Sequence, residues 1–255
     1  YLSIVLLIVS CGRKEVINQA HLNTPVVESY LVSGGDIKVT LYLPVALNAD
    51  VTNPTFINNA TVTVYENDIA KQLKFMGNGV YEDASTIVKK GYTYKLSFVY
   101  NGQNVTAQTV VPDNPVGFKE SASVFAVPQF GAGVRPSFPT PIVLSWTNNT
   151  QDYYMVAAKY VDTLFTAINT DTTENRPRFS RPPTQSNTTN LSFNLFSYYG
   201  MHHLYLYKVN QEYVDLFKSS GTSSLNLTNP QTNITNGYGI FTSFGVDSLL
   251  LNVTR

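Results

Sequence analysis

The chain has 255 residues, and its 17 Lys and Arg residues balance 17 Asp and Glu residues, so the formal net charge is zero. Nucleic-acid binding needs a basic patch or stripe, and this balance predicts no nucleic-acid partner. Only 13% of the residues are charged, about half the usual share for a folded domain. Abundant Thr, Tyr, Phe and Val favour strands over helices.

An almost unbroken apolar run, Leu2–Val9, opens the sequence and is followed by Ser10 and Cys11. A helix of this length spans about 12 Å, against about 30 Å for the bilayer core, so it is too short to cross a membrane. The run fits the hydrophobic part of a secretory signal peptide, with a small residue before the cleavage site. Because the sequence starts at Tyr1 without a basic segment, we expect residues 1–10 to be a signal peptide clipped at its start.

Cys11 is the only cysteine in the sequence and follows the expected cleavage site directly. This pattern resembles the lipobox of bacterial lipoproteins, which are cleaved before the cysteine and lipidated on its sulfur. The alternative is a buried N-terminal strand with an incidental cysteine. Lipidation would leave no thiol for a disulfide, and the lipid on Cys11 would be the membrane anchor. We expect no other cofactor and no metal.

The polar residues that follow predict a lipidated cysteine and tether over 11–24, and Pro25 then opens strand-like sequence. Strands are expected over Val26–Val32 and Ile37–Leu43, joined by a turn at Ser33-Gly34-Gly35-Asp36. Further strands are predicted over Ala60–Tyr65 with Val62 and Val64 inward, Tyr92–Tyr100, and Asn104–Val111. The pair Asn101-Gly102 predicts a hairpin because both residues tolerate positive φ.

The number of short strands over residues 25–111 predicts an immunoglobulin-like β-sandwich. Two prolines in Pro112-Asp113-Asn114-Pro115 restrict the backbone and interrupt strand pairing, which predicts a linker over 112–117. The remaining residues, 118–255, are predicted to form a C-terminal β domain.

Within the C-terminal part, strands are predicted over Phe118–Val127, Ile142–Trp146, Tyr153–Val161, Leu191–Phe196, His203–Val209, Gly237–Phe244 and Leu249–Val253. Ile142–Trp146 and Tyr153–Val161 are expected to pair around the single tryptophan, and residues 162–190 to form a long surface loop. One helix is expected over Asn210–Ser220, capped by Asn210 and ended by Gly221. The predicted fold class is therefore all-β, with two β-sandwich-like domains and one short helix in the second.

Two stretches are candidates for partner binding. Pro128–Pro141 is apolar and proline-rich, and it suits docking through Phe130, Arg135 and Phe138. The alternative is a loop that packs back on its own domain.

The second candidate is a group of aromatic residues around the strand that begins near His203: Phe196, Tyr198, Tyr199, Tyr205 and Tyr207. Aromatic rings of this kind stack on sugar rings or fill a protein interface, and the alternative is core and edge packing. Strand alternation places Leu204 and Leu206 inward and the two later tyrosines outward.

The residues that could support catalysis or metal binding are few. His21 lies in the tether, and His202 and His203 are neighbours on a strand, where adjacent side chains point to opposite faces. These histidines are not expected to share a metal ion. The sequence contains no His-Glu-x-x-His, Gly-x-Ser-x-Gly or phosphate-binding glycine motif, and no spacing marks two carboxylates as a pair. We therefore predict a protein that is not an enzyme.

Several segments in the last third resemble the C-terminal signature of a Bacteroidota lipoprotein family, domain of unknown function 4249: Leu204–Tyr213, Asn229-Pro230, Asn233-Ile234 and Asn236–Phe241. Others are similar to the opening of that family: Val26–Leu31, Val39–Leu41, Asn59–Val64, Gly79–Tyr81 and Gly91–Leu96. The resemblance implies a lipobox, an all-β architecture in two parts and an outer-membrane location. Family members often look like companions of TonB-dependent transporters, and the family supplies no activity and no catalytic residues.

Three triplets resemble the O-glycosylation tripeptide used on exported proteins in that phylum: Asp162-Thr163-Leu164, Asp171-Thr172-Thr173 and Asp247-Ser248-Leu249. Thr163, Thr172 and Ser248 are accordingly candidate acceptors, although a chain rich in Ser and Thr also produces such triplets by chance.

Together these observations predict a non-enzymatic lipoprotein of the outer membrane, anchored through Cys11, with the cell surface favoured over the periplasmic face. Its expected role is that of an accessory or binding subunit beside an outer-membrane β-barrel protein of the TonB-dependent transporter type. One alternative is a surface solute-binding protein that captures glycan or peptide. A weaker alternative is a hydrolase, which requires convergent acids or histidines in a pocket.

Overall fold

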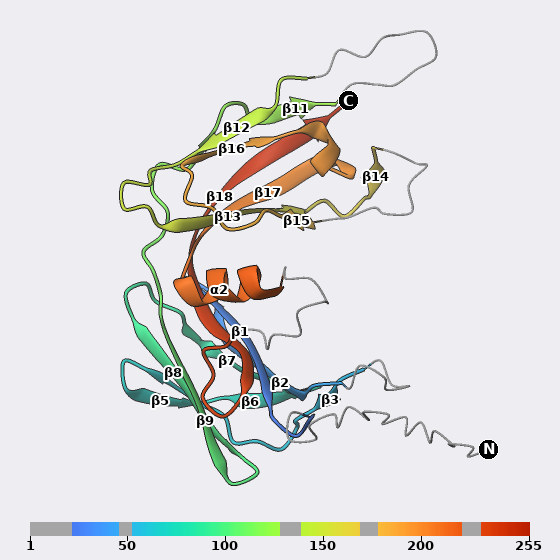
Figure 1. Ribbon diagram of the computed structural model, residues 1–255. Coiled ribbons are helices and arrows are strands. Elements are labelled where there is room, and N and C mark those ends of the chain that lie inside the picture. The colour runs from blue at the N-terminus through green and yellow to red at the C-terminus, as the bar shows by residue number, and fades with distance from the viewer. Residues whose placement is uncertain (1–21, 46–52, 128–138, 169–177, 221–230) are drawn as a thin grey trace, which may run out of the picture.

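The computed structural model describes residues 22–45, 53–127, 139–168, 178–220 and 231–255. These residues form two β-rich lobes, one above the other, with a single helix beside their junction (Figure 1). The predicted all-β class, with two sandwich-like parts and one short helix, is confirmed.

The first lobe contains β1 (Val26–Val32), β2 (Asp36–Leu43), β3 (Thr55–Phe56), β4 (Thr63–Glu66), β5 (Ile69–Gln72), β6 (Lys74–Gly77), β7 (Val80–Ile87), β8 (Thr93–Tyr100) and β9 (Gln103–Val110). The second contains β10 (Lys119–Glu120), β11 (Val124–Ala126), β12 (Ile142–Ser145), β13 (Tyr153–Tyr160), β14 (Thr166–Ala167), β15 (Arg178–Ser180), β16 (Thr188–Leu191), the 3-10 helix η1 (Phe193–Leu195) and β17 (Tyr198–Val209). The helix α2 (Gln211–Ser220) and the long strand β18 (Tyr238–Thr254) complete the described elements.

One large sheet runs through both lobes in the order β15-β13-β17-β18-β1-β2-β7-β6. In the first lobe it packs against the four-stranded sheet β5-β4-β8-β9, and in the second against the three-stranded sheet β10-β12-β16. The first core lies between these two sheets and is formed by every second residue of their strands. Leu31 and Leu41 from the large sheet pack in one cluster with Val64 and Leu96 from the smaller one, and all four side chains are at most 1% exposed.

The predicted hairpin turns are present. Gly34 has φ of 84° between β1 and β2, and Asn101 and Gly102 have φ of 48° and 75° between β8 and β9. The two successive positive φ angles at Asn101-Gly102 match the right-handed twist of the flanking strands, so this turn sets the register of the β8–β9 hairpin, whereas the β1–β2 turn has a single positive φ at Gly34.

Strand β18 belongs to both lobes. Its first part pairs in parallel with β1, from Tyr238 opposite Val26 onward, and its later part pairs antiparallel with β17. The sequence predicted two strands here, whereas the structure has one strand of 17 residues. As a result Phe241 lies in the first core and Leu251 in the second, both fully buried.

The expected pairing of Ile142–Trp146 with Tyr153–Val161 is wrong. Strand β12 pairs with β10 and β16, whereas β13 pairs with β15 and β17 in the opposite sheet. The connection crosses between the sheets. Within it, the Asn148 side chain accepts a hydrogen bond from the N–H of Asp152 and donates to the carbonyls of Asp152 and Gln185. The two segments still meet in the core, where the rings of Trp146 and Tyr154 lie 5.8 Å apart.

Two other expectations change in detail. The single strand predicted over Phe118–Val127 is divided into β10 and β11, which belong to different sheets. The described part of the predicted surface loop 162–190 contains β14 and β15 and the start of β16, because each of these short segments adds to an existing strand.

Helix α2 occurs where the sequence predicts it. The Asn210 backbone carbonyl accepts hydrogen bonds from the amides of Tyr213 and Val214. Its side-chain amide does not follow the predicted capping role but donates to the Val110 carbonyl at 2.9 Å and to the Thr109 hydroxyl at 3.0 Å. The residue before the helix therefore ties α2 to the first lobe.

The carboxylate of Glu212 extends this tie. One oxygen accepts hydrogen bonds from the hydroxyls of Thr109 on β9, at 2.8 Å, and Thr242 on β18, at 3.0 Å. Both threonines are at most 4% exposed, so without Glu212 their hydroxyls would lose a partner in a site poor in water.

We expect Glu212→Ala to lower the free energy of unfolding by about 1–3 kcal/mol, because it removes the shared acceptor of two buried hydroxyls. Asp215→Ala on the same helix is the matched control. Asp215 is exposed and bonds only its neighbour Gln211 among the described contacts, so its loss should stay within about 0.5 kcal/mol. Urea unfolding measures both, and equal effects would contradict a specific tie at Glu212.

A second stability test concerns the approach of β18 to β1. Gly239 has φ of 89°, and a Cβ there would lie 2.1 Å from the Val27 carbonyl oxygen. Gly34 has a similar φ of 84° with no atom within 4 Å of such a Cβ, so Gly34→Ala isolates the backbone cost of about 1–2 kcal/mol. Gly239→Ala should cost more by about 1 kcal/mol or more in urea unfolding. Equal losses of stability in the two variants would show that β1 and β18 can move apart without cost, and would contradict a tight contact at Gly239.

Candidate functional site

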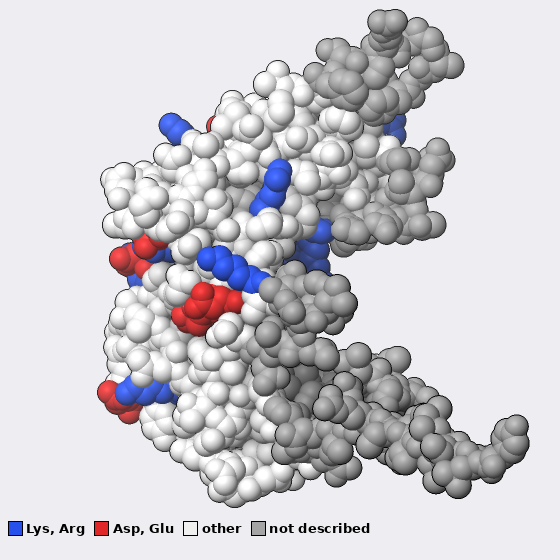
Figure 2. All heavy atoms as spheres, in the orientation of Figure 1, with Lys and Arg blue, Asp and Glu red and all other residues white. Residues whose placement is uncertain are grey.

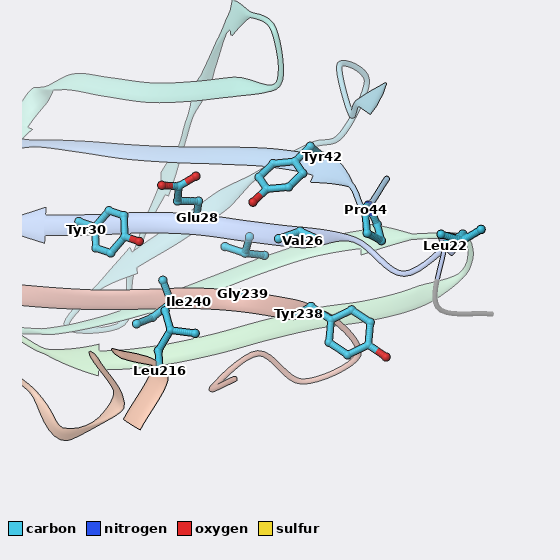
Figure 3. Close-up of a pocket in the computed structure, with 11 residues that line it drawn as sticks. Leu22, Val26, Glu28, Tyr30, Tyr42, Pro44, Leu216, Tyr238, Gly239 and Ile240 are labelled. Carbon is cyan, nitrogen blue, oxygen red and sulfur yellow. The ribbon is translucent and has the colours of Figure 1, made fainter. Parts of the chain in front are cut away.

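One hollow in the described residues is a groove on the outer face of the large sheet in the first lobe, here named the sheet groove (Figure 3). Its volume is about 490 Å³, within the range of small-molecule and peptide sites. It is lined by Leu22, Val26, Val27, Glu28, Tyr30, Tyr42, Pro44, Leu216, Tyr238, Gly239 and Ile240.

Strand alternation explains why these side chains gather. Val26, Glu28 and Tyr30 point outward from β1, while the residues between them are buried in the first core. The register places Tyr42 of β2 beside Val26, and Ile240 of β18 beside Glu28. The lining thus comes from three adjacent strands, and α2 contributes a further wall through Leu216.

The electrostatics of the sheet groove are simple. Glu28 is the one charged residue among its lining residues, and it lies between the rings of Tyr30 and Tyr42 (Figure 3). Burial, followed by the negative charge of Glu28, raises the pKa of Tyr30 to about 12, and the same two causes raise the pKa of Tyr42. Both phenols therefore stay protonated at neutral pH, and the site offers aromatic and apolar walls around one carboxylate.

A row of aromatic rings leads from the groove into the second lobe. Tyr30 stacks on Phe244 at 6.0 Å between ring centroids, and Phe244 lies 5.7 Å from Tyr207. Tyr207 stacks on Tyr205 at 5.8 Å, and Tyr205 stacks on His203 at 5.6 Å. Phe244 lies on β18 at the junction, where it pairs with Val32 of β1 and with Val209 of β17. The aromatic row is therefore continuous from the first lobe to the second.

The structure divides the predicted aromatic cluster. Tyr205 and Tyr207 face outward in the aromatic row, as expected, while Leu204 and Leu206 are fully buried. Tyr198 is only 9% exposed and packs on Tyr160 and Phe165.

The other two members of the predicted cluster also lie away from the row. Tyr199 lies against the Arg255 guanidinium, 5.4 Å from its ring centroid. Phe196 is 5% exposed and belongs to the second core. Strand alternation separates part of the cluster, because Tyr198 lies on the same buried face as Leu204 and Leu206, whereas Tyr199 lies on the opposite face with Tyr205 and Tyr207.

The two adjacent histidines lie on opposite faces, as strand geometry predicts. His202 is 4% exposed, and its Nδ1 lies 3.1 Å from the Gly200 carbonyl oxygen. Burial lowers the pKa of His202, which keeps the ring neutral in the core. Within the described residues, no group of three or more His, Cys, Asp or Glu side chains could hold a metal ion.

Several candidate residues lie outside the described part of the chain: Cys11, His21, Phe130, Arg135, Phe138 and Thr172. Of the remaining O-glycosylation candidates, Thr163 and Ser248 are both exposed. Their modification stays a prediction.

Sequence reasoning did not identify the sheet groove. The available signal was the outward series Val26, Glu28 and Tyr30, in which an apolar and an aromatic residue stand on a face that alternation would leave polar. On the face shown in Figure 2 the charged side chains are few and of both signs, in keeping with the low charged fraction.

The fold and the groove define a two-lobed β-sandwich protein with aromatic side chains on the outer face of its large sheet. The chain belongs to the family described as domain of unknown function DUF4249, whose model matches residues 15–249. No curated protein matches it. Among solved structures, the crystal structure of the chicken CNTN1 FN1–FN3 domains is 13% identical, with 91% of this chain and 67% of that chain covered and a TM-score of 0.25. No helix in the described residues is long and apolar enough to cross a membrane.

We expect Glu28→Gln to lower the pKa of Tyr30 from about 12 toward, but not to, the ordinary value of 10.0, because burial is the larger cause and remains. Tyrosine labelled with ¹³C at the ring carbon that bears the hydroxyl, titrated by NMR and assigned with Tyr30→Phe, measures this shift. Since the folded pKa exceeds the unfolded value, the stability contributed by Tyr30 is present below pH 10 and is lost as the pH rises toward 12. An unchanged pKa would show that Glu28 does not face Tyr30.

Proposed function

We propose that this chain is a non-enzymatic outer-membrane lipoprotein that acts as an accessory or binding subunit beside a β-barrel protein of the TonB-dependent transporter type. The observation that carries the proposal is the position of the sole cysteine, Cys11, which follows the apolar run Leu2–Val9 and the small residue Ser10. A thioether-linked lipid on this sulfur would attach the protein to the membrane, with the cell surface favoured over the periplasmic face.

Confinement by the lipid is the physical basis of the proposed role. A subunit held in the same plane as its partner meets it at a high effective concentration, so weak contacts are sufficient for a stable complex. Aromatic side chains provide such contacts, since they bury large areas with little loss of conformational freedom. The aromatic row and the sheet groove support a binding role because both present rings on the outer face of the large sheet.

A second candidate function is capture of a peptide or glycan as a surface solute-binding protein. The observation that favours it is the concave, aromatic-walled sheet groove with a volume of about 490 Å³. The two functions differ in what co-purifies: a subunit retains a barrel protein, whereas a solute-binding protein retains a small ligand or none.

The anchoring step is tested by Cys11→Ser in the native host. We expect the wild-type protein to sediment with the outer membrane and the variant to appear in the soluble fraction, because the serine hydroxyl does not accept the lipid. Intact-mass spectrometry should find a diacylglycerol adduct on the wild type alone. An unmodified sulfur in protein that washes off with salt would overturn the proposal.

The partner is tested by affinity purification from outer membranes solubilised in mild detergent. We expect an outer-membrane β-barrel protein to be recovered in near-stoichiometric amount. Membranes that contain the Cys11→Ser variant serve as the control, because loss of planar confinement should weaken recovery. Purification of the lipidated chain without any barrel protein would count against the subunit role.

A further inference from the structure

We propose that the sheet groove binds an extended peptide segment of a partner protein through one basic side chain, held by Glu28, with apolar residues two positions to either side. This inference deepens the proposed binding role and rests on it. It names the chemistry of the occupant, which neither the family nor the fold assigns.

The first step is the charge. Glu28 is exposed and carries the sole formal charge among the residues that line the groove. The ion pairs within the described residues involve Glu66, Asp68 and Asp152, and none of them involves Glu28. A carboxylate between aromatic walls attracts a cation and disfavours acidic ligands such as nucleic acids and acidic glycans.

The second step is the aromatic setting of that charge. Tyr30, on the same strand, and Tyr42, on the neighbouring strand β2, lie on either side of Glu28 (Figure 3). The faces of tyrosine rings attract guanidinium and ammonium groups when the cation lies within about 6 Å of the ring centroid. A planar guanidinium can stack on a ring and bond a carboxylate at the same time, which favours Arg over Lys.

The third step is the spacing of the apolar lining. Val26 and Tyr30 lie two residues before and after Glu28 on β1, about 7 Å along the strand in each direction. In an extended peptide, side chains two residues apart point the same way with the same spacing. The residues at positions −2 and +2 from the basic one would therefore meet apolar or aromatic side chains: Val26, Tyr42 and Pro44 toward one end, and Tyr30 toward the other. Ile240 and Leu216 form the apolar wall beside Glu28 itself.

The probe is a fluorescently labelled, end-blocked peptide Leu-Ser-Arg-Ser-Leu, titrated into the full chain with Cys11→Ser and followed by fluorescence anisotropy. Two matched peptides replace Arg by Gln or Glu. We expect the Arg peptide to bind roughly tenfold or more tightly than the Gln peptide, as a charge-assisted hydrogen bond implies, and the Glu peptide to bind most weakly. The preference for Arg should shrink as the salt concentration rises.

Glu28→Gln should remove the preference for Arg over Gln and leave the weaker apolar binding in place. Ile240→Ala should weaken the Arg and Gln peptides by the same factor, because it alters a wall and not the charge. Glu120→Gln, on β10 in the second lobe, is the matched charge control and should change neither affinity. Circular dichroism of each variant verifies that the fold is retained.

Equal affinity for the Arg and Glu peptides, absence of binding by all three, or an Arg preference that survives Glu28→Gln would each overturn the proposal. A dimer in sedimentation velocity that dissociates in Glu28→Gln would assign the groove to a second copy and would also overturn it. These measurements use unlipidated protein without a barrel partner. Their failure is therefore distinguishable from failure of the proposed function, which fractionation and co-purification decide.

Discussion

The pairing of β18 with two strands of different lobes is the constraint on which the rest of the structure depends. Its first part lies beside β1 and its later part beside β17, so this one strand joins the portions of the large sheet that belong to the two lobes. From Ile240 to Gly245 both faces of β18 are buried, because one faces the first core and the other lies under α2 and its neighbours. A shift of this strand would disturb both cores at once.

At the junction of the lobes, the same strand and helix α2 also position the outer surface. Asn210 and Glu212 tie α2 to β9 and β18 through buried hydroxyls, and Leu216 on the same helix forms a wall of the sheet groove. Phe244, at the point where β18 leaves the first lobe, links Tyr30 in the groove to Tyr207 in the second lobe. The groove and the aromatic row are therefore two parts of one surface, positioned by the same strand and the same helix.

This arrangement suits a binding protein whose affinity is divided between a membrane anchor and a modest contact surface. An anchor at Cys11 would supply effective concentration, and the groove would supply selectivity through one carboxylate in aromatic surroundings. The tyrosines around Glu28 are neutral at neutral pH, so the carboxylate is the single charge of the groove lining. The partner-binding loop predicted over Pro128–Pro141 remains a separate prediction.

The sequence by itself determined the β-rich class, the hairpin turns at Gly34 and Asn101-Gly102, the position of α2, and the inward direction of Leu204 and Leu206. These features depend on local backbone preference and on a period of two, which neighbouring residues encode. Only the tertiary structure decided that β12 and β13 belong to opposite sheets, that β18 serves both lobes, and that Glu28 meets Ile240 and Tyr42. Alternation tells which face of a strand is buried, but it does not identify the strand that lies beside it, and a groove built from three strands exists only once those neighbours are chosen.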